Sequence, residues 1–205
     1  MPDVKSEPLS HRQRQALETR RLVAQAARTL FIAHGYAATS IEAVAAEAGV
    51  SPRTVFAIFG TKKAILGAIC EEWLMEAGVM EAIATGMAET DLGRRLALVA
   101  RTSRRKWEVD RGVRWMLGNA AASDAEVARM IAGWTDDRAR SFHQVVTGVE
   151  GQLRDGVDGN RAGALIRALT GAEVYTELVQ GEGWTPAEYE SWLAGLLKDL
   201  LLPPR

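Results

Sequence analysis

The sequence has a single cysteine, Cys70, among its 205 residues, and it has no long apolar run. A lone cysteine cannot form an intramolecular disulfide, which favours a reducing compartment. The beginning, MPDVKSEPLSHRQRQ, carries charges with no apolar segment behind them, so we expect no secretory signal. Because no stretch of about 18 uncharged apolar residues occurs, we expect no membrane span and a cytoplasmic protein.

Groups that carry catalysis or bind metals are also scarce. The three histidines, His11, His34 and His143, are scattered without metal-ligand spacing. Cys70 lies on the apolar stripe of a predicted helix, where an inert core thiol is the better interpretation. Neither a glycine-rich phosphate loop nor a nucleophile elbow occurs. We therefore predict no enzyme, no metal site and no cofactor.

Charge is distributed unevenly along the chain, although the formal net charge is only -1. Residues 1–66 hold nine Lys and Arg against five Asp and Glu, a balance of +4. Residues 67–205 hold sixteen against twenty-one, a balance of -5. A basic N-terminal part joined to an acidic remainder indicates that only the N-terminal part meets a polyanion.

Helical periodicity dominates the chain, and we find no convincing strand alternation. Capping signals support this interpretation: Thr39 can cap TSIE with Glu42 reaching back, and SDAE (123–126) and TPAE (185–188) have the same pattern. We predict turns at ATGMAETD (84–91) and RDGVDGN (154–160). The expected fold is all-α with about nine helices, near 10–34, from 39, from 51, 61–84, 91–109, from 113, 123–153, 165–179 and 185–200.

The stretch TSIEAVAAEAGVSPRTVFAIFGTKK has the spacing of a helix-turn-helix. Ala45 is small enough for two helices to cross closely, and Gly49 tolerates the positive φ of the turn. Val55 is an apolar anchor ten residues after Ala45. Ser51 and Pro52 then start a short second helix, whose first residues in this motif face base edges in the major groove of DNA.

The whole segment RRLVAQAARTLFIAHGYAATSIEAVAAEAGVSPRTVFAIFGTKKAIL resembles the TetR family of bacterial transcription regulators. The distinctive parts are LFIAHGYAATSI, the AGVS turn, Phe59 and TKKAIL after it. The resemblance implies a three-helix DNA-binding head at residues 1–66, with an arm at 1–9. It also implies a helical ligand-binding and dimerisation body at residues 67–205.

We expect eight residues of the head to contact DNA. Arg53 suits bidentate pairing with guanine, although a solvated surface charge is the alternative. Thr39 and Ser40 can offer hydroxyl and N–H groups to phosphate, or act as caps alone. Phe56 stands where the family usually has a tyrosine, so it cannot donate a hydrogen bond to phosphate. The set is Thr39, Ser40, Ser51, Pro52, Arg53, Thr54, Phe56 and Lys62.

Two further sets are expected in the body. The last two helices carry small residues and leucines that suit a four-helix dimer interface, although packing inside the monomer is the alternative. That interface set is Leu165, Leu169, Ala172, Trp192, Leu196 and Leu197. By resemblance the middle helices enclose an effector pocket, with Trp73, Trp107, Trp115, Trp134 and Arg138 as its candidates, although ordinary core packing also explains each tryptophan.

These expectations describe a ligand-responsive, nucleoid-associated transcription regulator. It would bind an inverted-repeat operator in double-stranded DNA as a homodimer, and a small lipophilic or aromatic effector would release it. Repression is the default outcome. The alternative is a helical protein-interaction module with weakened DNA binding, which the apolar Phe56 and Ala57 support. The operator, the regulated genes and the effector are not specified by the sequence.

Overall fold

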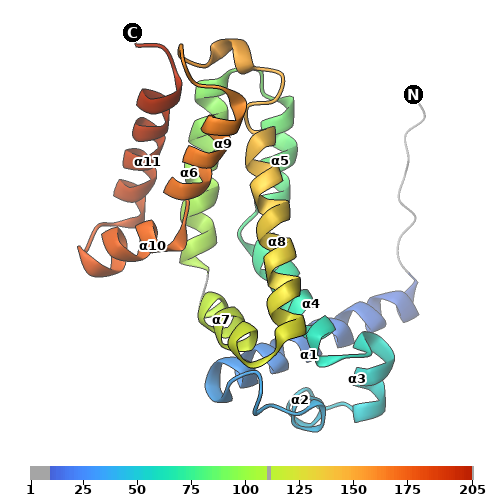
Figure 1. The fold of residues 1–205 in the computed structure, drawn as a ribbon. Coiled ribbons are helices and arrows are strands. Elements are labelled where there is room, and N and C mark those ends of the chain that lie inside the picture. Colours follow the sequence, from blue (N-terminus) through green and yellow to red (C-terminus); the bar gives the residue numbers. More distant parts are fainter. Residues whose placement is uncertain (1–9, 110–111, 205) are drawn as a thin grey trace. The chain divides into compact units, whose positions relative to one another are not determined.

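The computed structural model describes residues 10–109 and 112–204, and the side chains of residues 135–141 lie outside that description. Within the described residues the chain is helical and has no strand (Figure 1). Eleven α-helices, a 3-10 turn and a π-helical segment follow one another: α1 His11–His34, α2 Ile41–Glu47, α3 Pro52–Phe59, α4 Lys62–Glu76, α5 Val79–Ala88, α6 Leu92–Glu108, α7 Val113–Ser123, α8 Ala125–Gln144, η1 Glu150–Gln152, α9 Gly159–Leu169, α10 Ala172–Tyr175, η2 Thr176–Gly181 and α11 Pro186–Leu201.

The all-α class is confirmed, but the expected number of about nine helices is too low, because apolar periodicity continues through backbone breaks. The expected helix over 61–84 is two helices, since Gly78 adopts a φ of 70° and ends α4. The helix α5 then continues to Ala88, into a segment predicted as a turn. The expected helix over 165–179 is interrupted at Thr170 and Gly171 before α10 begins.

Two expected helix boundaries also differ. The predicted cap Thr39 is not the cap of α2; Ser40 is, because its side chain accepts a hydrogen bond from the N–H of Ala43. The long helix expected to reach residue 153 ends at Gln144, and residues 145–148 form turns before η1. In contrast, the cap of α11 is as predicted, since Thr185 and Glu188 form a complete capping box.

The chain divides into two compact units. The N-terminal unit consists of Met1–Glu71 and Gly112–Ala125, and the C-terminal unit consists of Glu72–Arg111 and Glu126–Arg205. The helix α4 contributes residues to both units.

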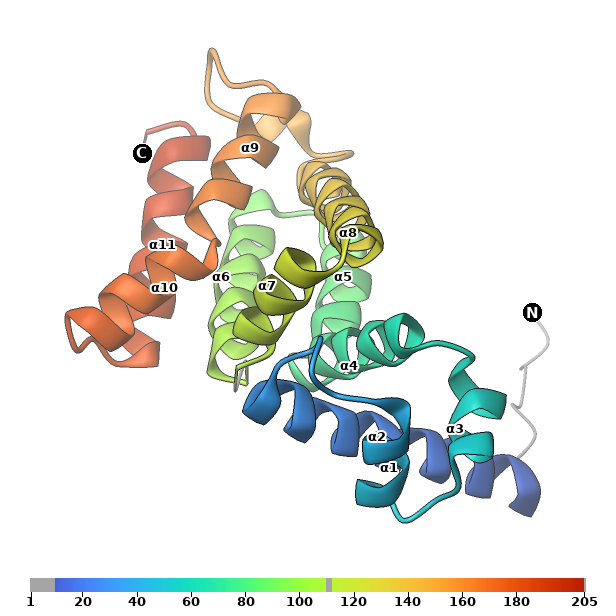
Figure 2. The same cartoon turned by 60° about the horizontal axis from the view of Figure 1, so that its bottom comes forward.

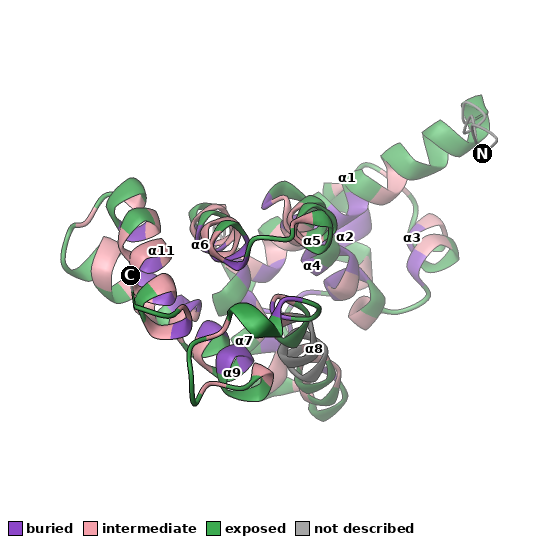
Figure 3. Ribbon diagram, turned by 90° about the horizontal axis from the view of Figure 1, so that it is seen from above, coloured by how far each residue is buried: buried purple, intermediate pink, exposed green. Residues whose placement is uncertain are grey.

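The N-terminal unit contains α1, α2, α3, the first part of α4, and α7. Its core is a set of fully buried apolar side chains from these helices, including Phe31, Val44, Val55 and Ile65. The helix α1 contacts both α2 and α7, and α2 contacts α3 (Figure 2). The first two turns of α1 are exposed, as Figure 3 shows by their green colour.

The C-terminal unit is organised around the contact between α6 and α11. Four residues of α11 at four-residue spacing, Tyr189, Leu193, Leu197 and Leu201, are fully buried. Burying each such leucine stabilises the fold by about 1.5–3 kcal/mol relative to exposure. None of the described helices combines the length and apolar character needed to cross a lipid bilayer.

Candidate nucleic-acid interface

The turn between α2 and α3 has the geometry that the sequence predicts. Gly49 adopts a φ of 68°, and the N–H of Val50 donates to the carbonyl oxygen of Ala45 at 2.9 Å. Ala45 is 1% exposed and Val55 is fully buried, so the two helices cross on a small residue and an apolar anchor. This is the close crossing that a helix-turn-helix requires.

The short helix α3 is fixed at both ends. Ser51 Oγ accepts a hydrogen bond from the N–H of Thr54 at 3.1 Å, and Pro52 occupies the first turn without losing a needed donor. At the other end Gly60 adopts a φ of 70°, and its N–H donates to the carbonyl oxygen of Phe56. Capping and tertiary packing therefore stabilise a helix that is too short to persist alone in water.

The two faces of α3 differ in burial. Val55 and Phe59 are buried in the unit. Pro52, Arg53, Phe56 and Ala57 are exposed, and Phe56 retains 50% of its surface. An exposed arginine beside an exposed aromatic ring on a rigid, capped helix is suited to contact a groove of DNA.

The two hydroxyl residues of α3 have a more local role. Ser51 Oγ and Thr54 Oγ1 are 2.9 Å apart and share a hydrogen bond. Thr54 is half-buried. The hydroxyl of Thr54 therefore has a partner within the cap, and Arg53 is left as the exposed polar side chain at the start of α3.

The two residues predicted to contact phosphate at the start of α2, Thr39 and Ser40, have different environments in the structure. Ser40 is exposed, and its Oγ accepts a hydrogen bond from the N–H of Ala43 at 3.1 Å. Thr39 is 4% exposed, and its hydroxyl donates to the carbonyl oxygen of Gly35 at 2.9 Å. The exposed helix start at Ser40 is thus accessible to an anion, whereas the Thr39 side chain belongs to the core of the α1–α2 turn.

Lys62, the first residue of α4, is directed into the same turn. Its Nζ donates to the carbonyl oxygens of Tyr36 at 2.7 Å and Thr39 at 3.0 Å, and it lies 4.3 Å from the centroid of the Tyr36 ring. Burial lowers the pKa of Lys62, and the carboxylate of Asp124 opposes that shift. The ammonium therefore joins α4 to the α1–α2 turn.

The helix α7 supplies further support to this turn, and sequence reasoning missed it. The N–H of Tyr36 donates to Oδ1 of Asn119 at 3.1 Å, across 83 positions of sequence. Burial, with a smaller effect of Asp124, raises the pKa of Tyr36 to about 12, so this phenol stays neutral at physiological pH. No local pattern links residue 119 to residue 36, and only the fold brings them together.

The predicted effector residues fall into different environments. Trp73 and Trp107 are buried in the C-terminal unit, with ring centroids 5.7 Å apart, and the ammonium of Lys106 lies over both rings at 4.8 and 4.4 Å. Trp134 is half-buried on α8. Trp115 belongs to the N-terminal unit and is 56% exposed. The side chain of Arg138 lies outside the described residues.

The predicted dimer residues lie on α9, α10 and α11. Leu197 and Ala172 are buried within the unit itself. Leu165, Leu169, Trp192 and Leu196 remain half-exposed. The ring of Trp192 meets that of Trp184 edge to face at 5.8 Å. Part of the expected set therefore forms the monomer core, and the half-exposed part remains accessible to a partner.

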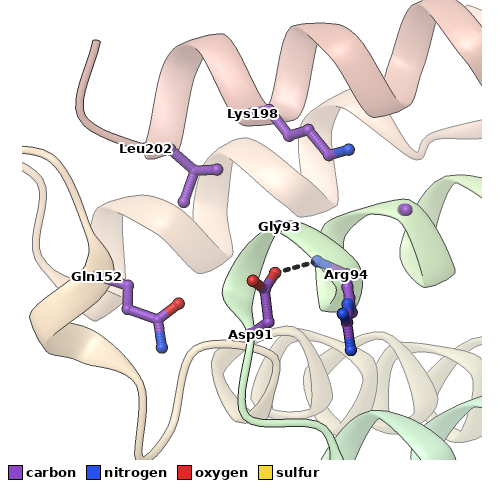
Figure 4. A pocket seen from close by; sticks show the side chains of 7 residues that line it. Asp91, Gly93, Arg94, Gln152, Lys198 and Leu202 are labelled. Carbon is purple, nitrogen blue, oxygen red and sulfur yellow. Dashed lines mark hydrogen bonds between the residues drawn. The ribbon is translucent and has the colours of Figure 1, made fainter. Parts of the chain in front are cut away.

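A polar cavity of about 270 Å³ lies in the C-terminal unit where α6 begins (Figure 4). Its lining residues include Asp91, Arg94, Gln152 and Lys198. Asp91 caps α6 by accepting a hydrogen bond from the N–H of Arg94, and Gln152 accepts one from Leu92. These groups satisfy the helix start, so the cavity does not resemble the apolar sites that bind lipophilic ligands.

Comparison with known proteins finds a family model that is similar to part of the N-terminal unit. Residues 23–69 match the family model described as bacterial regulatory proteins, tetR family. No curated protein matches the sequence.

Several solved structures share the fold. Native NalD, the secondary repressor of the MexAB-OprM multidrug efflux pump in Pseudomonas aeruginosa, superposes with a TM-score of 0.70 at 18% identity, covering 93% of this chain and 100% of that chain. SmeT in complex with triclosan superposes with a TM-score of 0.74 at 20% identity, covering 91% of this chain and 92% of that chain. FadR from Bacillus subtilis in complex with stearoyl-CoA superposes with a TM-score of 0.63 at 19% identity, covering 86% of this chain and 96% of that chain.

Proposed function

We propose that this chain is a DNA-binding transcription regulator, a homodimeric repressor released by a small lipophilic effector, since residues 23–69 match the family model described as bacterial regulatory proteins, tetR family. The observation that carries the DNA-binding part is the capped helix α3, whose exposed face presents Arg53 and Phe56 while Val55 and Phe59 anchor it.

The proposed DNA contacts divide by chemistry. Arg53 pairs with a base edge in the major groove, where a guanine offers two acceptors to a guanidinium. Ser40 and the exposed start of α2 contact phosphate through hydroxyl and N–H groups. Lys62 serves these contacts indirectly, because it holds the α1–α2 turn through two carbonyl oxygens.

A homodimer follows from the need for specificity. One short recognition helix reads only a few base pairs, and a two-fold dimer doubles the contacts on an inverted repeat. The half-exposed Leu165, Leu169, Trp192 and Leu196 support an interface built on α9 and α11. Such an interface is isologous, with the same residues contributed by both protomers.

The effector proposal rests on apolar surface in the C-terminal unit. The helix α5 is rich in apolar residues, yet none of them is buried. Two proteins of similar fold were solved with lipophilic ligands, triclosan and stearoyl-CoA, which supports an effector of that chemical class here.

The test is selection of bound duplexes from a random DNA library with the purified chain. We expect enrichment of an inverted repeat, whose two-fold symmetry would also report the dimer. The Arg53→Ala variant should bind that duplex more weakly and relax the preference at one base pair per half-site. Failure to enrich any sequence at low salt would refute the proposal and favour a protein-interaction role.

A further inference from the structure

The exposed face of α3 is chemically unusual for a surface that reads DNA. Successive residues of an α-helix are about 100° apart around its axis, so Arg53 and Phe56 are neighbours at the centre of the exposed face, and Pro52 and Ala57 flank them. All four are exposed. Arg53 is the single polar side chain among these four, and the other three are apolar.

The ring of Phe56 is not buried in the core of the N-terminal unit. Phe59 is 8% exposed, and the guanidinium of Arg20 lies over its ring at 4.7 Å from the centroid. Phe56, one turn earlier, remains 50% exposed. The caps at Ser51 and Gly60 fix α3, so the ring is held at the surface beside Arg53.

The major groove offers few partners for an apolar ring. Base edges there present hydrogen-bond donors and acceptors, with one apolar group, the 5-methyl of thymine. Placing the ring of Phe56 against a polar edge removes water from that edge without supplying a hydrogen bond, which is unfavourable. Placing it against a methyl group buries apolar surface on both sides.

We propose that Phe56, assisted by Ala57, reads the 5-methyl group of a thymine adjacent to the base pair contacted by Arg53. Phenylalanine and alanine both suit contact with this methyl group. Each operator half-site then contains a thymine selected by apolar contact next to a guanine selected by hydrogen bonds. The inference rests on the proposed function, since it requires that α3 enters the major groove of DNA.

The decisive experiment replaces thymine by uracil in the selected duplex, one position at a time and symmetrically in both half-sites. Uracil keeps every hydrogen-bonding group and lacks only the methyl. Loss of one buried methyl weakens binding by about fourfold per half-site, so we expect about a tenfold to twentyfold rise in Kd at one position and little change elsewhere. Thymines outside the selected inverted repeat provide the internal control.

Variants assign the effect to Phe56. Phe56→Ala removes an exposed ring, so the chain should stay folded, as circular dichroism checks, and its ratio of Kd values for uracil and thymine should approach one. Phe56→Leu keeps an apolar side chain and should retain most of the discrimination. Arg53→Ala should weaken binding yet keep the ratio, because it removes a different contact.

Two results would overturn the inference in different ways. If the chain binds its selected duplex but no uracil substitution changes Kd by more than twofold, or if discrimination persists in Phe56→Ala, the methyl reading by Phe56 is wrong while DNA binding stands. If no duplex is selected, the proposed function and this inference fail together.

Discussion

Replacing Lys62 by methionine removes an ammonium and keeps an unbranched side chain. That ammonium donates to two carbonyl oxygens at 2.7 and 3.0 Å and lies over the Tyr36 ring. Hydrogen bonds from a charged donor contribute about 1.5–3 kcal/mol each, and an exposed cation–π contact adds about 0.5–1 kcal/mol. Burial lowers the pKa of Lys62, so desolvation offsets part of this gain. We expect the free energy of unfolding of the N-terminal unit to fall by about 2 kcal/mol.

The assay is urea-induced unfolding followed by circular dichroism, with Lys198→Met as the matched control. Lys198 lies on α11, at the polar cavity of the C-terminal unit, and its replacement changes the net charge equally. Only Lys62→Met should lower the unfolding midpoint of the N-terminal unit.

A second measurement is the salt dependence of DNA binding. Each phosphate contact adds about 0.9 to the slope of log Kd against log salt concentration, and neither variant should change that slope by this amount.

A different pair of results would refute the reasoning. If Lys62→Met unfolds at the same urea concentration as the parent chain, the two carbonyl contacts do not stabilise the fold. If the salt slope also falls by about 0.9 for each protomer, Lys62 contacts phosphate directly and its primary role is in binding DNA.

Three further predictions concern local structure. Gly78→Ala should lower the midpoint of thermal unfolding, because alanine at a φ of 70° is strained and its Cβ would lie 3.0 Å from Arg105 Nη1. Gly118→Ala is the control: its Cβ would meet open space within a helix, so this change should raise the midpoint slightly. Asn119→Leu should destabilise the N-terminal unit by about 1 kcal/mol in urea unfolding, since the half-buried N–H of Tyr36 loses its acceptor; an unchanged midpoint would show that water replaces the amide. Glu188 accepts hydrogen bonds from Thr185, which hold its pKa below the ordinary 4.5, so it stabilises α11 above that pH and loses this effect as the pH falls through its folded pKa. Glu188→Gln should therefore flatten the acid side of the stability profile, and a profile identical to the parent would contradict this account.

The sequence predicted the α2–turn–α3 region well because the signals there are local. Gly49 must adopt a positive φ, Ser51 and Pro52 start α3, and Val55 must be buried, and each requirement is met within a few residues. Such steric and capping rules depend little on the rest of the chain.

Other features depend on contacts between distant segments, which periodicity does not encode. The apolar pattern runs unbroken past Gly78, so the sequence predicted one helix where there are two. Trp115 was grouped with the other tryptophans by sequence position, yet it belongs to the N-terminal unit. Lys62 was assigned to phosphate by its place at a helix start, although two carbonyl oxygens already bind its ammonium.

The discontinuity of the N-terminal unit has a consequence for biosynthesis. Its first segment ends at Glu71, and its second segment, which carries Asn119, is complete only at Ala125. At about 5–20 residues per second, a ribosome needs roughly 3 to 11 s to make the 54 residues from Glu72 to Ala125. During that interval the nascent α1–α2 turn lacks its acceptor from α7. For the same reason, a chimera that transfers only residues 1–71 to another protein would contain α3 but would lack α7, whose Asn119 accepts the hydrogen bond from Tyr36.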